Sequence, residues 1–433
     1  MKKAISTSIV GASLSLIVAS CGAGKITSTT TSKAPSNVTT SGVPITSTST
    51  THPTTTTTTQ PPIPSTIGAP SDFAPHNFSF VSSSMGFMFG SYKQGCSTSS
   101  TSTGCSGILR TSDTGHSWGL LPSHGIYDSS PLLANATSSG AGVAVSKVSF
   151  ISPLVGYAFG PGLAFTIDGG VNFSPLLSSF TTSTTRFLDV EVGGSTTYFV
   201  AVGLNFTGVS PNSIVFGSFP NISLSNVNPS ISIISSSAIG SGDLQSATAA
   251  IRAYPFGVAV EFGVNNFTTA LVGAAGSSNF TAIAQNPCSQ VQYSLPSLPP
   301  LAIVDASPLT IYALCASNPG AGSSQKTVFA STNMGSSWAQ KGDAPNGGQP
   351  YGIDAVAPAS VIVSASSGAT FIYTSTDGGV TFKTAFTGIP GGSEILYGPY
   401  FLSSSLAVVL SYSQGSPFSF LVSTDGGASF SAP

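Results

Sequence analysis

An eight-residue pattern that returns five times constrains the fold of this chain more than any other feature of its sequence. It reads Ser or Thr, any residue, Asp or Asn, any residue, Gly, two further residues and an aromatic. The copies span residues 111–118, 166–173, 331–338, 375–382 and 423–430, and only 331–338 carries Asn. A short carboxylate or amide accepts hydrogen bonds from the backbone N–H groups of a tight turn, and Gly supplies the positive φ. The pattern therefore predicts five similar β-hairpin turns.

We assign the characteristic residues of each copy to structure, because such turns belong at the outer rim of a repeated fold. They are Asp113, Gly115 and Trp118; Asp168, Gly170 and Phe173; Asn333, Gly335 and Trp338; Asp377, Gly379 and Phe382; and Asp425, Gly427 and Phe430. The copies resemble the Asp-box (BNR) repeat of sialidase-like β-propellers, and this resemblance implies blades of four antiparallel strands around an axis.

The unit from Val148 to Phe173 also resembles the blades of the photosystem II stability and assembly factor group. It contains Phe150, then Gly-Tyr-Ala-Phe-Gly at 156–160, then a copy of the repeat. Many exported bacterial proteins share this blade pattern, so the resemblance implies the architecture and not a photosynthetic role.

The spacing of the repeats gives the number of blades. Successive Asp or Asn positions are 55, 165, 44 and 48 residues apart, and the long gap has room for two units whose turns have diverged. Short apolar runs rich in β-branched and aromatic residues precede each turn and also occur inside the gap. There are seven: 86–90, 156–160, 198–203, 257–260, 310–314, 361–363 and 406–410. We predict an all-β chain forming a single seven-bladed β-propeller, with six or eight blades as alternatives.

Few residues follow the last repeat, which leaves little sequence for an outer strand in the last blade. We therefore predict that the segment from Ser71 to Pro75 completes that blade and closes the ring.

The first residues have the features of a secretory signal. Lys2 and Lys3 precede a short apolar stretch, which ends in Val-Ala-Ser before Cys21. These last four residues resemble the lipobox of bacterial lipoproteins, which implies that Cys21 becomes the lipidated first residue. An ordinary signal peptide with an incidental Cys is the alternative. We expect a protein of the bacterial cell envelope, anchored by lipid on the outer side of the membrane.

The next segment is dominated by Thr, Ser and Pro, including an unbroken run of Thr at 54–59. Such a composition cannot bury enough apolar surface to fold. We therefore predict three parts: a lipoprotein signal peptide at 1–20, a disordered tether at 21–66 and the propeller at 67–433.

Four cysteines remain in the exported part: Cys96, Cys105, Cys288 and Cys315. An even number in an exported chain predicts disulfides, and neighbours in sequence would pair as 96 with 105 and 288 with 315. Metal binding by these residues is the rival interpretation. The chain has no CxxC motif, and its four His lie away from the Cys pairs, so we expect no metal and no cofactor.

Charged residues are scarce, at 6% of the chain. Residues 67–433 hold eight cationic and fourteen acidic side chains, a net charge of 8 − 14 = −6, and no basic patch for nucleic acid. Eight charges fall at or beside the segments that we assign to the innermost strands, which line the central channel of a propeller. They are the candidate binding residues: Lys147, Arg186, Asp189, Glu191, Arg252, Asp305, Asp354 and Glu394. The alternative is that these strands face water and tolerate charge without forming a site.

A sialidase is not expected. The resemblance implies three Arg on the substrate carboxylate, a Tyr activated by a Glu, and an Asp as acid or base. This chain has only Arg110, Arg186 and Arg252, and Arg110 directly precedes a rim turn. The Arg-Ile-Pro motif of sialidases is also absent. We predict no catalytic residues.

The leading hypothesis is therefore a monomeric, non-enzymatic surface lipoprotein whose propeller binds a protein or glycan. The competing hypothesis is a glycoside hydrolase, or a lyase of unfamiliar type, that uses Asp189, Glu191, Asp305 or Asp354. It predicts two carboxylates about 5–10 Å apart at the channel mouth. A third hypothesis is a passive envelope component, whose low charge would suit an acidic habitat.

Overall fold

The computed structural model describes residues 64–432, apart from 95–104, 129–141, 224–225, 266–268, 291–299, 305–308, 318–319, 321, 357–358, 389–393 and 414–416. The predicted signal peptide, Cys21 and nearly all of the predicted tether thus lie outside the described residues. In the described part no helix is long and apolar enough to cross a membrane.

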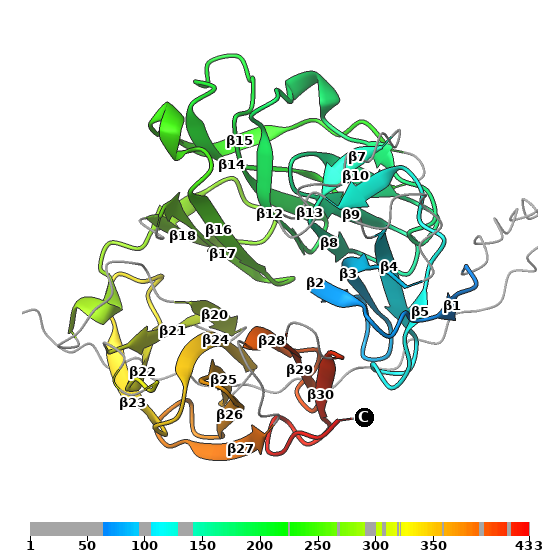
Figure 1. The fold of residues 1–433 in the computed structure, drawn as a ribbon. Helices are drawn as coiled ribbons and strands as arrows, with labels where there is room; N and C mark the ends of the chain where they lie inside the picture. Colours follow the sequence, from blue (N-terminus) through cyan, green and yellow to red (C-terminus); the bar gives the residue numbers. More distant parts are fainter. Residues whose placement is uncertain are drawn as a thin grey trace, which may run out of the picture. The chain divides into compact units, whose positions relative to one another are not determined.

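Seven antiparallel sheets follow one another along the chain and form the blades of a propeller (Figure 1). Blade 1 contains β1 (Ile67–Gly68), β2 (Ala74–Phe80), β3 (Gly86–Tyr92), β4 (Cys105–Thr111) and β5 (Gly119–Leu120). Blade 2 contains β8 (Lys147–Phe150), β9 (Gly156–Phe159), β10 (Leu163–Thr166) and β11 (Ser174–Pro175). Blade 3 contains β12 (Arg186–Gly193), β13 (Thr196–Val202), β14 (Ser213–Pro220) and β15 (Ser232–Ala238). Blade 4 contains β16 (Ala247–Ala253), β17 (Gly257–Val264), β18 (Thr269–Ala274) and β19 (Phe280–Ala282).

The remaining blades repeat the same order. Blade 5 contains β20 (Leu301–Val304), β21 (Thr310–Ala316), β22 (Lys326–Ser331) and β23 (Ala339–Ala344). Blade 6 contains β24 (Gln349–Val356), β25 (Ser360–Ser366), β26 (Thr370–Ser375) and β27 (Lys383–Gly388), and blade 7 contains β28 (Glu394–Phe401), β29 (Ala407–Ser413) and β30 (Ser419–Ser423). A small parallel pair, β6 (Ile126–Asp128) and β7 (Val143–Val145), lies between blades 1 and 2 in sequence, and the described helices are the short 3₁₀ turns η2 (Ser178–Phe180), η3 (Ser241–Asp243) and η4 (Pro287–Gln290).

The seven-bladed prediction is confirmed. All seven apolar runs picked out in the sequence fall on the second strands of the blades, which are β3, β9, β13, β17, β21, β25 and β29. The two runs inside the long gap between repeats belong to blades 3 and 4. These blades have the same four-stranded order as blades 2, 5 and 6, although they lack the eight-residue turn.

The second strands are apolar at nearly every position because both of their faces are buried. Successive side chains of a strand point to opposite faces of its sheet. In β13, Tyr198 and Val200 therefore face blade 4, whereas Phe199 and Ala201 face blade 2. A strand buried on both faces reads as a continuous apolar run, which is why these segments were recognisable in the sequence.

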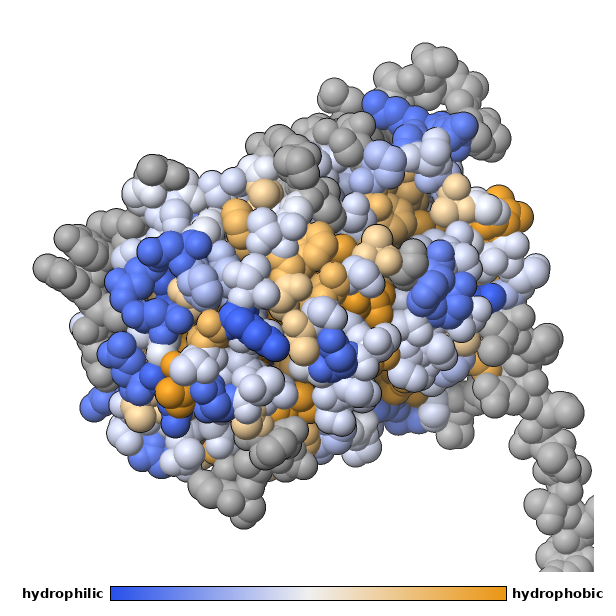
Figure 2. Space-filling model, turned by 90° about the horizontal axis from the view of Figure 1, so that it is seen from below, coloured by the Kyte–Doolittle hydropathy of each residue, from blue (hydrophilic) through white to orange (hydrophobic). Residues whose placement is uncertain are grey.

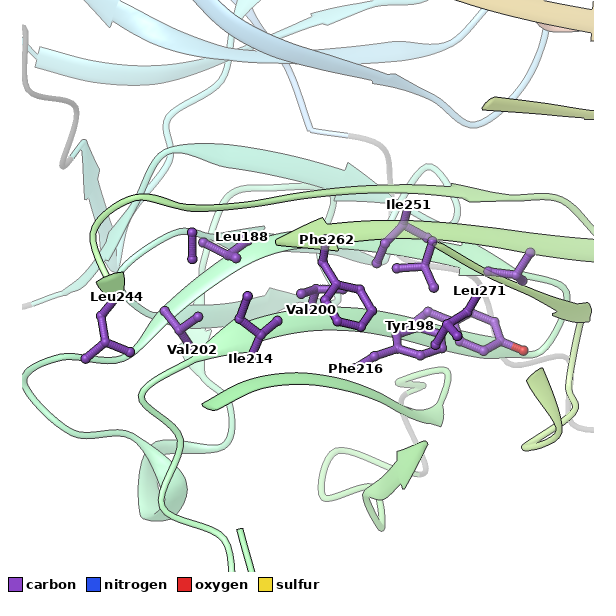
Figure 3. Packing of buried hydrophobic residues seen from close by; sticks show 13 residues of the cluster. Leu188, Tyr198, Val200, Val202, Ile214, Phe216, Leu244, Ile251, Phe262 and Leu271 are labelled. Carbon is purple, nitrogen blue, oxygen red and sulfur yellow. The ribbon is translucent and has the colours of Figure 1, made fainter. Parts of the chain in front are cut away.

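The hydrophobic core is divided into seven clusters, one at each interface between neighbouring blades. Figure 3 shows the cluster between blades 3 and 4, where Tyr198 and Phe216 lie against Leu271 and Ile251. Burial of one such side chain stabilises the fold by about 1.5–3 kcal/mol. Each blade therefore depends on two neighbours, and the ring is stable only when it is closed.

The ring is not closed by the segment from Ser71 to Pro75, and that prediction was wrong. Ala74 and Pro75 begin β2, the first strand of blade 1, and the preceding strand β1 pairs with β5 at the outer edge of the same blade. Blade 7 has three strands, and only an isolated bridge from Ser431 to Val422 extends it.

Aromatic packing joins blade 7 to blade 1 instead. The ring of Phe78 in β2 lies 5.1 Å from that of Tyr400 and 5.7 Å from that of Phe420, as measured between ring centroids. Trp118 packs on Phe420 at 5.5 Å. The Tyr397 hydroxyl also donates a hydrogen bond to the Pro75 carbonyl at 3.1 Å. Side-chain contacts thus join blade 7 to blade 1, in place of a strand shared between the two ends of the chain.

The five repeats form similar hydrogen-bonded turns after the third strand of their blades. In the copy of blade 2, the Asp168 carboxylate accepts from the Thr166 hydroxyl (2.8 Å) and from the backbone N–H groups of Val171 (3.1 Å) and Asn172 (2.9 Å). Gly170 has a φ of 90°. In the copy with Asn, the Asn333 side-chain oxygen accepts the same backbone bond, from the Ser337 N–H at 2.9 Å, while the amide nitrogen donates to the Ser337 hydroxyl at 2.8 Å.

Cys288 and Cys315 form a disulfide, as the pairing of sequence neighbours predicts, and join η4, which lies between blades 4 and 5 in sequence, to β21 of blade 5. Cys96 lies outside the described residues, so the pairing with Cys105 stays a prediction. No group of three potential metal ligands occurs among the residues that the structure describes.

The surface reflects the scarcity of charge. Figure 2 views the molecule from the side on which Figure 1 places β27, and there apolar residues gather near the middle while strongly hydrophilic residues form separate patches. With 6% charged residues in the chain, hydroxyl and amide groups supply most of the surface polarity.

The Asp168 turn provides a test of the role of the repeats. Replacement of Asp168 by Ala leaves several backbone and hydroxyl donors without an acceptor, and we expect a loss of about 1–3 kcal/mol of unfolding free energy. Asp168→Asn should cost less than about 1 kcal/mol, because Asn333 already fills this position in another copy. Urea unfolding of both variants decides the matter, and equal losses would contradict this role.

Candidate functional site

The first strands of the blades line the central axis and run in the same direction. Arg186, at the start of β12, donates from Nη1 to the carbonyls of Leu244 (3.2 Å) and Gln245 (2.8 Å), just before β16. Further along, the Ile251 N–H of β16 donates to Asp189 of β12 at 2.7 Å. Corresponding ends of the first strands therefore gather at the same mouth of the channel, as the ring in Figure 1 illustrates.

Each end of the channel is hollowed by a pocket. The amino-end pocket, at the starts of the first strands, has a volume of about 720 Å³ and is lined by residues including His76, Lys147, Arg186, Tyr397 and Tyr412. The carboxyl-end pocket, at the ends of these strands, is smaller, at about 200 Å³. Its lining includes Phe78, Phe80, Glu191, Arg252, Tyr254, Asp354, Tyr400 and Phe401.

The structure distributes the predicted site residues over three levels of the channel. Lys147 and Arg186 line the amino-end pocket, whereas Glu191, Arg252 and Asp354 line the carboxyl-end pocket. Asp189 lies between them and is buried. Asp305 and the side chain of Glu394 lie outside the described residues.

Asp189 and Asp354 bind the backbone of neighbouring blades. Asp189 accepts from the N–H of Val190 (3.1 Å) in its own strand and from that of Ile251 in blade 4. Asp354 accepts from the N–H groups of Ala355 (2.9 Å) and of Phe401 in blade 7 (2.6 Å). Burial raises the pKa of Asp354, and these hydrogen bonds oppose the rise. Both carboxylates thus link adjacent first strands.

The same kind of contact joins blades 1 and 2 without charge. The Asn77 side chain of β2 accepts from the Val148 N–H at 2.9 Å and donates to the Val148 carbonyl at 2.7 Å. Asn77 and Asp189 occupy equivalent positions, because each directly follows a β-bulge in the first strand of its blade. A short polar side chain at this point is therefore a structural device of the ring.

Tyr254 crosses the carboxyl end of the axis. Its hydroxyl donates to Asp354 Oδ1 at 2.6 Å, so that the segment after β16 in blade 4 reaches blade 6, two blades further around the ring. Arg252, two residues earlier, lies with its guanidinium carbon 5.4 Å from the centre of the Tyr400 ring of blade 7. Tyr254 and Arg252 thus line the pocket at the carboxyl end of the channel.

Arg252 is the cation of this cluster, and its pKa lies above the ordinary value. Burial acts against its charge, but the field of nearby phenols and carboxylates outweighs burial. The contributing groups are Tyr400, Tyr254, Asp189 and Asp354. The guanidinium therefore stays charged at any pH at which the protein is folded.

Glu191 is the carboxyl group of the carboxyl-end pocket whose pKa lies well above its ordinary value. Burial, together with the charge of Asp189, raises its pKa to about 8, and the positive charges of Arg252 and Lys147 oppose the rise. Its described hydrogen bond is a long one, from the Ser149 hydroxyl at 3.5 Å. Glu191 can therefore donate a hydrogen bond into the carboxyl-end pocket.

Sequence reasoning missed Tyr254, Tyr400 and Glu261. A signal for Tyr254 was available, because it lies two residues after Arg252, directly beyond the end of β16, and side chains two residues apart in an extended chain point to the same side. Glu261 in β17 is 3% exposed, and its Oε1 has no hydrogen-bond partner. Burial raises its pKa to about 8, opposed by Arg252 and by a hydrogen bond from the Leu301 backbone. The apolar residues around Glu261 in β17 gave no indication that its carboxyl group is buried toward blade 5.

Lys326 is a second buried charge that the sequence did not single out. It is 0% exposed, and its ammonium donates to the carbonyls of Ser324 (2.9 Å), Gly347 (3.0 Å) and Gly348 (3.2 Å). Burial lowers its pKa to about 8. Three carbonyl acceptors satisfy the three donors of an ammonium group, so Lys326 ties blade 5 to the turn that leads into blade 6.

No protein-family model matches the chain, and no curated protein matches it. Solved structures with a similar arrangement include YCF48 bound to D1 peptide, with 13% identity over 84% of this chain and 99% of the other, at a TM-score of 0.47. YCF48 from Cyanidioschyzon merolae has 16% identity, covers 84% and 96%, and also gives 0.47. The polysaccharide lyase Uly1 has 6% identity, covers 86% and 94%, and gives 0.44. Similarity this low gives no information on ligand or activity.

The buried carboxyl groups predict how stability depends on pH. The folded state keeps the Glu261 proton up to about pH 8, whereas the unfolded chain loses it near the ordinary value of 4.5. The stabilisation that the Glu261 proton gives to the folded state is therefore complete below pH 4.5, and it is lost as the pH rises through 8. We expect the unfolding free energy to fall by about 1–4 kcal/mol between pH 5 and pH 8.5 because of this one group. In the Glu261→Gln variant the unfolding free energy, measured by urea titration at both pH values, should decrease less between pH 5 and pH 8.5, by about the same 1–4 kcal/mol. Asp72→Asn is the control for net charge, because Asp72 is exposed and an Asn side-chain oxygen can still accept from the Lys93 N–H, which bonds to the carboxylate at 2.8 Å.

Proposed function

We propose that this chain is a surface-anchored lipoprotein whose propeller binds a protein or glycan partner without catalysis. The observation that carries the proposal is the use of the axial carboxylates. Asp189 and Asp354 are each occupied by backbone N–H groups of two strands and so hold the ring together. A hydrolase would need two carboxylates free to reach the same sugar.

The amino-end pocket is the surface that we assign to the partner. It has the larger volume, and its described lining contains Lys147 and Arg186 but no Asp or Glu. Ile395, which also lines it, is 41% exposed. Two cations, an exposed apolar side chain and the tyrosines Tyr397 and Tyr412 favour an acidic segment of a protein or an anionic glycan.

A hydrolase with an axial acidic site is the second candidate, and Glu191 is the observation in its favour. A carboxyl group with a pKa near 8 suits a general acid. A hydrolase also needs a second carboxylate, as nucleophile or base, and the candidate nearest to hand, Asp354, already accepts hydrogen bonds on both oxygens. Hydrolysis or elimination products from a polysaccharide panel that disappear in Glu191→Gln would favour this candidate over the first.

The passive envelope hypothesis is compatible with the raised pKa values of Glu191 and Glu261, because both groups favour the folded state in mild acid. It requires no ligand, and a saturable partner would exclude it.

The anchor is tested through Cys21. Expressed in a bacterium with its native leader, the full chain should incorporate labelled palmitate and sediment with membranes, because acyl chains on Cys21 add membrane affinity. Cys21→Ser should abolish the labelling and release the protein. Persistent labelling of Cys21→Ser, or no labelling of the native chain, would contradict lipidation at this residue.

Partner binding is tested with the purified Cys21→Ser chain on a glycan array and by cross-linking to isolated cell envelopes. We expect binding that weakens with salt and falls at least about tenfold in Lys147→Gln/Arg186→Gln, because two charges leave the amino-end pocket. Lys341→Gln/Lys383→Gln, with the same charge change on exposed outer strands, is the matched control. Absence of any ligand at micromolar protein would overturn the proposal. Salt dependence of the unsubstituted protein tests it even if the double variant misfolds.

A further inference from the structure

The carboxyl-end pocket contains a guanidinium whose hydrogen-bonding capacity is largely unused. Within the described part of the chain, Arg252 makes one hydrogen bond, from Nη1 to the Ile251 carbonyl at 3.3 Å. A guanidinium carries five N–H donors in a fixed plane. Arg186 at the opposite mouth differs, because its Nη1 alone reaches two carbonyls. Arg252 is thus a partly buried cation that lines a pocket and still has donors to offer.

Among the residues that the structure describes, the two aspartates whose charge acts on Arg252 make their hydrogen bonds to other groups. Asp354 is engaged by Tyr254 and by the N–H groups of Ala355 and Phe401. Asp189 is engaged by Val190 and Ile251 and does not line the pocket. Asp189 and Asp354 stabilise the positive charge of Arg252 electrostatically, but neither makes a described hydrogen bond to its guanidinium group.

The volume and the other lining residues of the carboxyl-end pocket indicate the size and chemical character of a ligand that would fit it. About 200 Å³ accommodates one sugar ring or one amino acid. Phe78, Phe80, Tyr400 and Phe401 line this space, so aromatic groups lie beside the polar ones, although Phe78 and Phe80 also pack in the core between blades 7 and 1. Glu191 adds a polar group on the same lining.

We propose that the carboxyl-end pocket binds a small monocarboxylate, whose carboxylate pairs with the Arg252 guanidinium. Planar, two-point bonding of carboxylate is the interaction for which Arg is best suited. A single negative charge is favoured over two, because Asp189 and Asp354 are close enough to influence Arg252 and would repel a dianion such as phosphate. Protonated Glu191 can donate to the same carboxylate.

This site is separate from the partner surface of the proposed function. It lies at the opposite mouth of the channel, beyond the contact between Tyr254 and Asp354, and the described linings of the two pockets share no residue. Either assignment can therefore fail without the other.

The three arginines of the chain make a direct test by NMR. The Nε–H groups of Arg110, Arg186 and Arg252 give three side-chain signals, and Arg252→Lys assigns one of them. D-glucuronate is titrated against D-glucose, and N-acetylalanine against its amide, so that each pair differs in the carboxylate. We expect saturable movement of the Arg252 signal with the acids and not with the neutral partners, while Arg110 and Arg186 stay in place. Which acid binds distinguishes a sugar acid from a peptide carboxyl terminus.

Affinity measured by calorimetry should fall at least about tenfold in Arg252→Lys, because Lys keeps the charge but cannot bond in two places at once. Phe80→Leu, which trims an aromatic wall and leaves the charges unchanged, should weaken binding with the Arg252 signal still moving. The proposal is overturned if acids and neutral partners act alike, if phosphate displaces the acids, or if only the Arg186 signal moves. The last result would place carboxylate binding at the amino-end pocket. If Arg252→Lys does not fold, Arg110→Lys and Arg186→Lys assign the other two signals, and titration of the unsubstituted protein then still decides the question.

Discussion

Apolar packing between the faces of neighbouring blades is the interaction on which the whole structure depends. Each sheet has two buried faces, and each face belongs to a different cluster, so the seven clusters form one closed series. A four-stranded sheet cannot bury both faces alone, because its apolar side chains alternate between them. Closure thus adds to stability, and at the last junction the aromatic contacts of Phe78, Tyr400 and Phe420 take part in it.

Polar residues on the axis serve this closure first. Asn77, Asp189 and Asp354 each use a short side chain to bind the backbone of a neighbouring first strand. Such bonds satisfy N–H groups that would otherwise be buried without a partner. A charge-poor chain therefore has few charges left for ligands. Arg252 stands out because it makes a single described hydrogen bond, whereas Lys147 and Arg186 donate to backbone carbonyls and also line the amino-end pocket.

The two ends of the channel differ in their linings. Tyr254 and Arg252 extend from blade 4 toward blades 6 and 7 at the carboxyl end, whereas Lys147 and Arg186 line the amino end. The two mouths differ in size, charge and lining. A binding protein built this way can present one face to a large partner and keep the other for a small molecule.

The sequence by itself determined the repeat, the second strands and the number of blades, because turn chemistry and burial on both faces are local properties that repeat along the chain. Tyr198 to Val202 could be recognised as a core strand without knowledge of its neighbours. Part of the carboxyl-end pocket could also be predicted, because Arg252 and Glu191 lie on strands that the sequence assigned to the central channel. Only the tertiary structure decided how blades 1 and 7 meet, that Asp189 and Asp354 are occupied by backbone, and that Glu261 and Lys326 are buried. These properties depend on contacts between residues up to several hundred positions apart, as between Tyr397 and Pro75, and no spacing in the sequence records them.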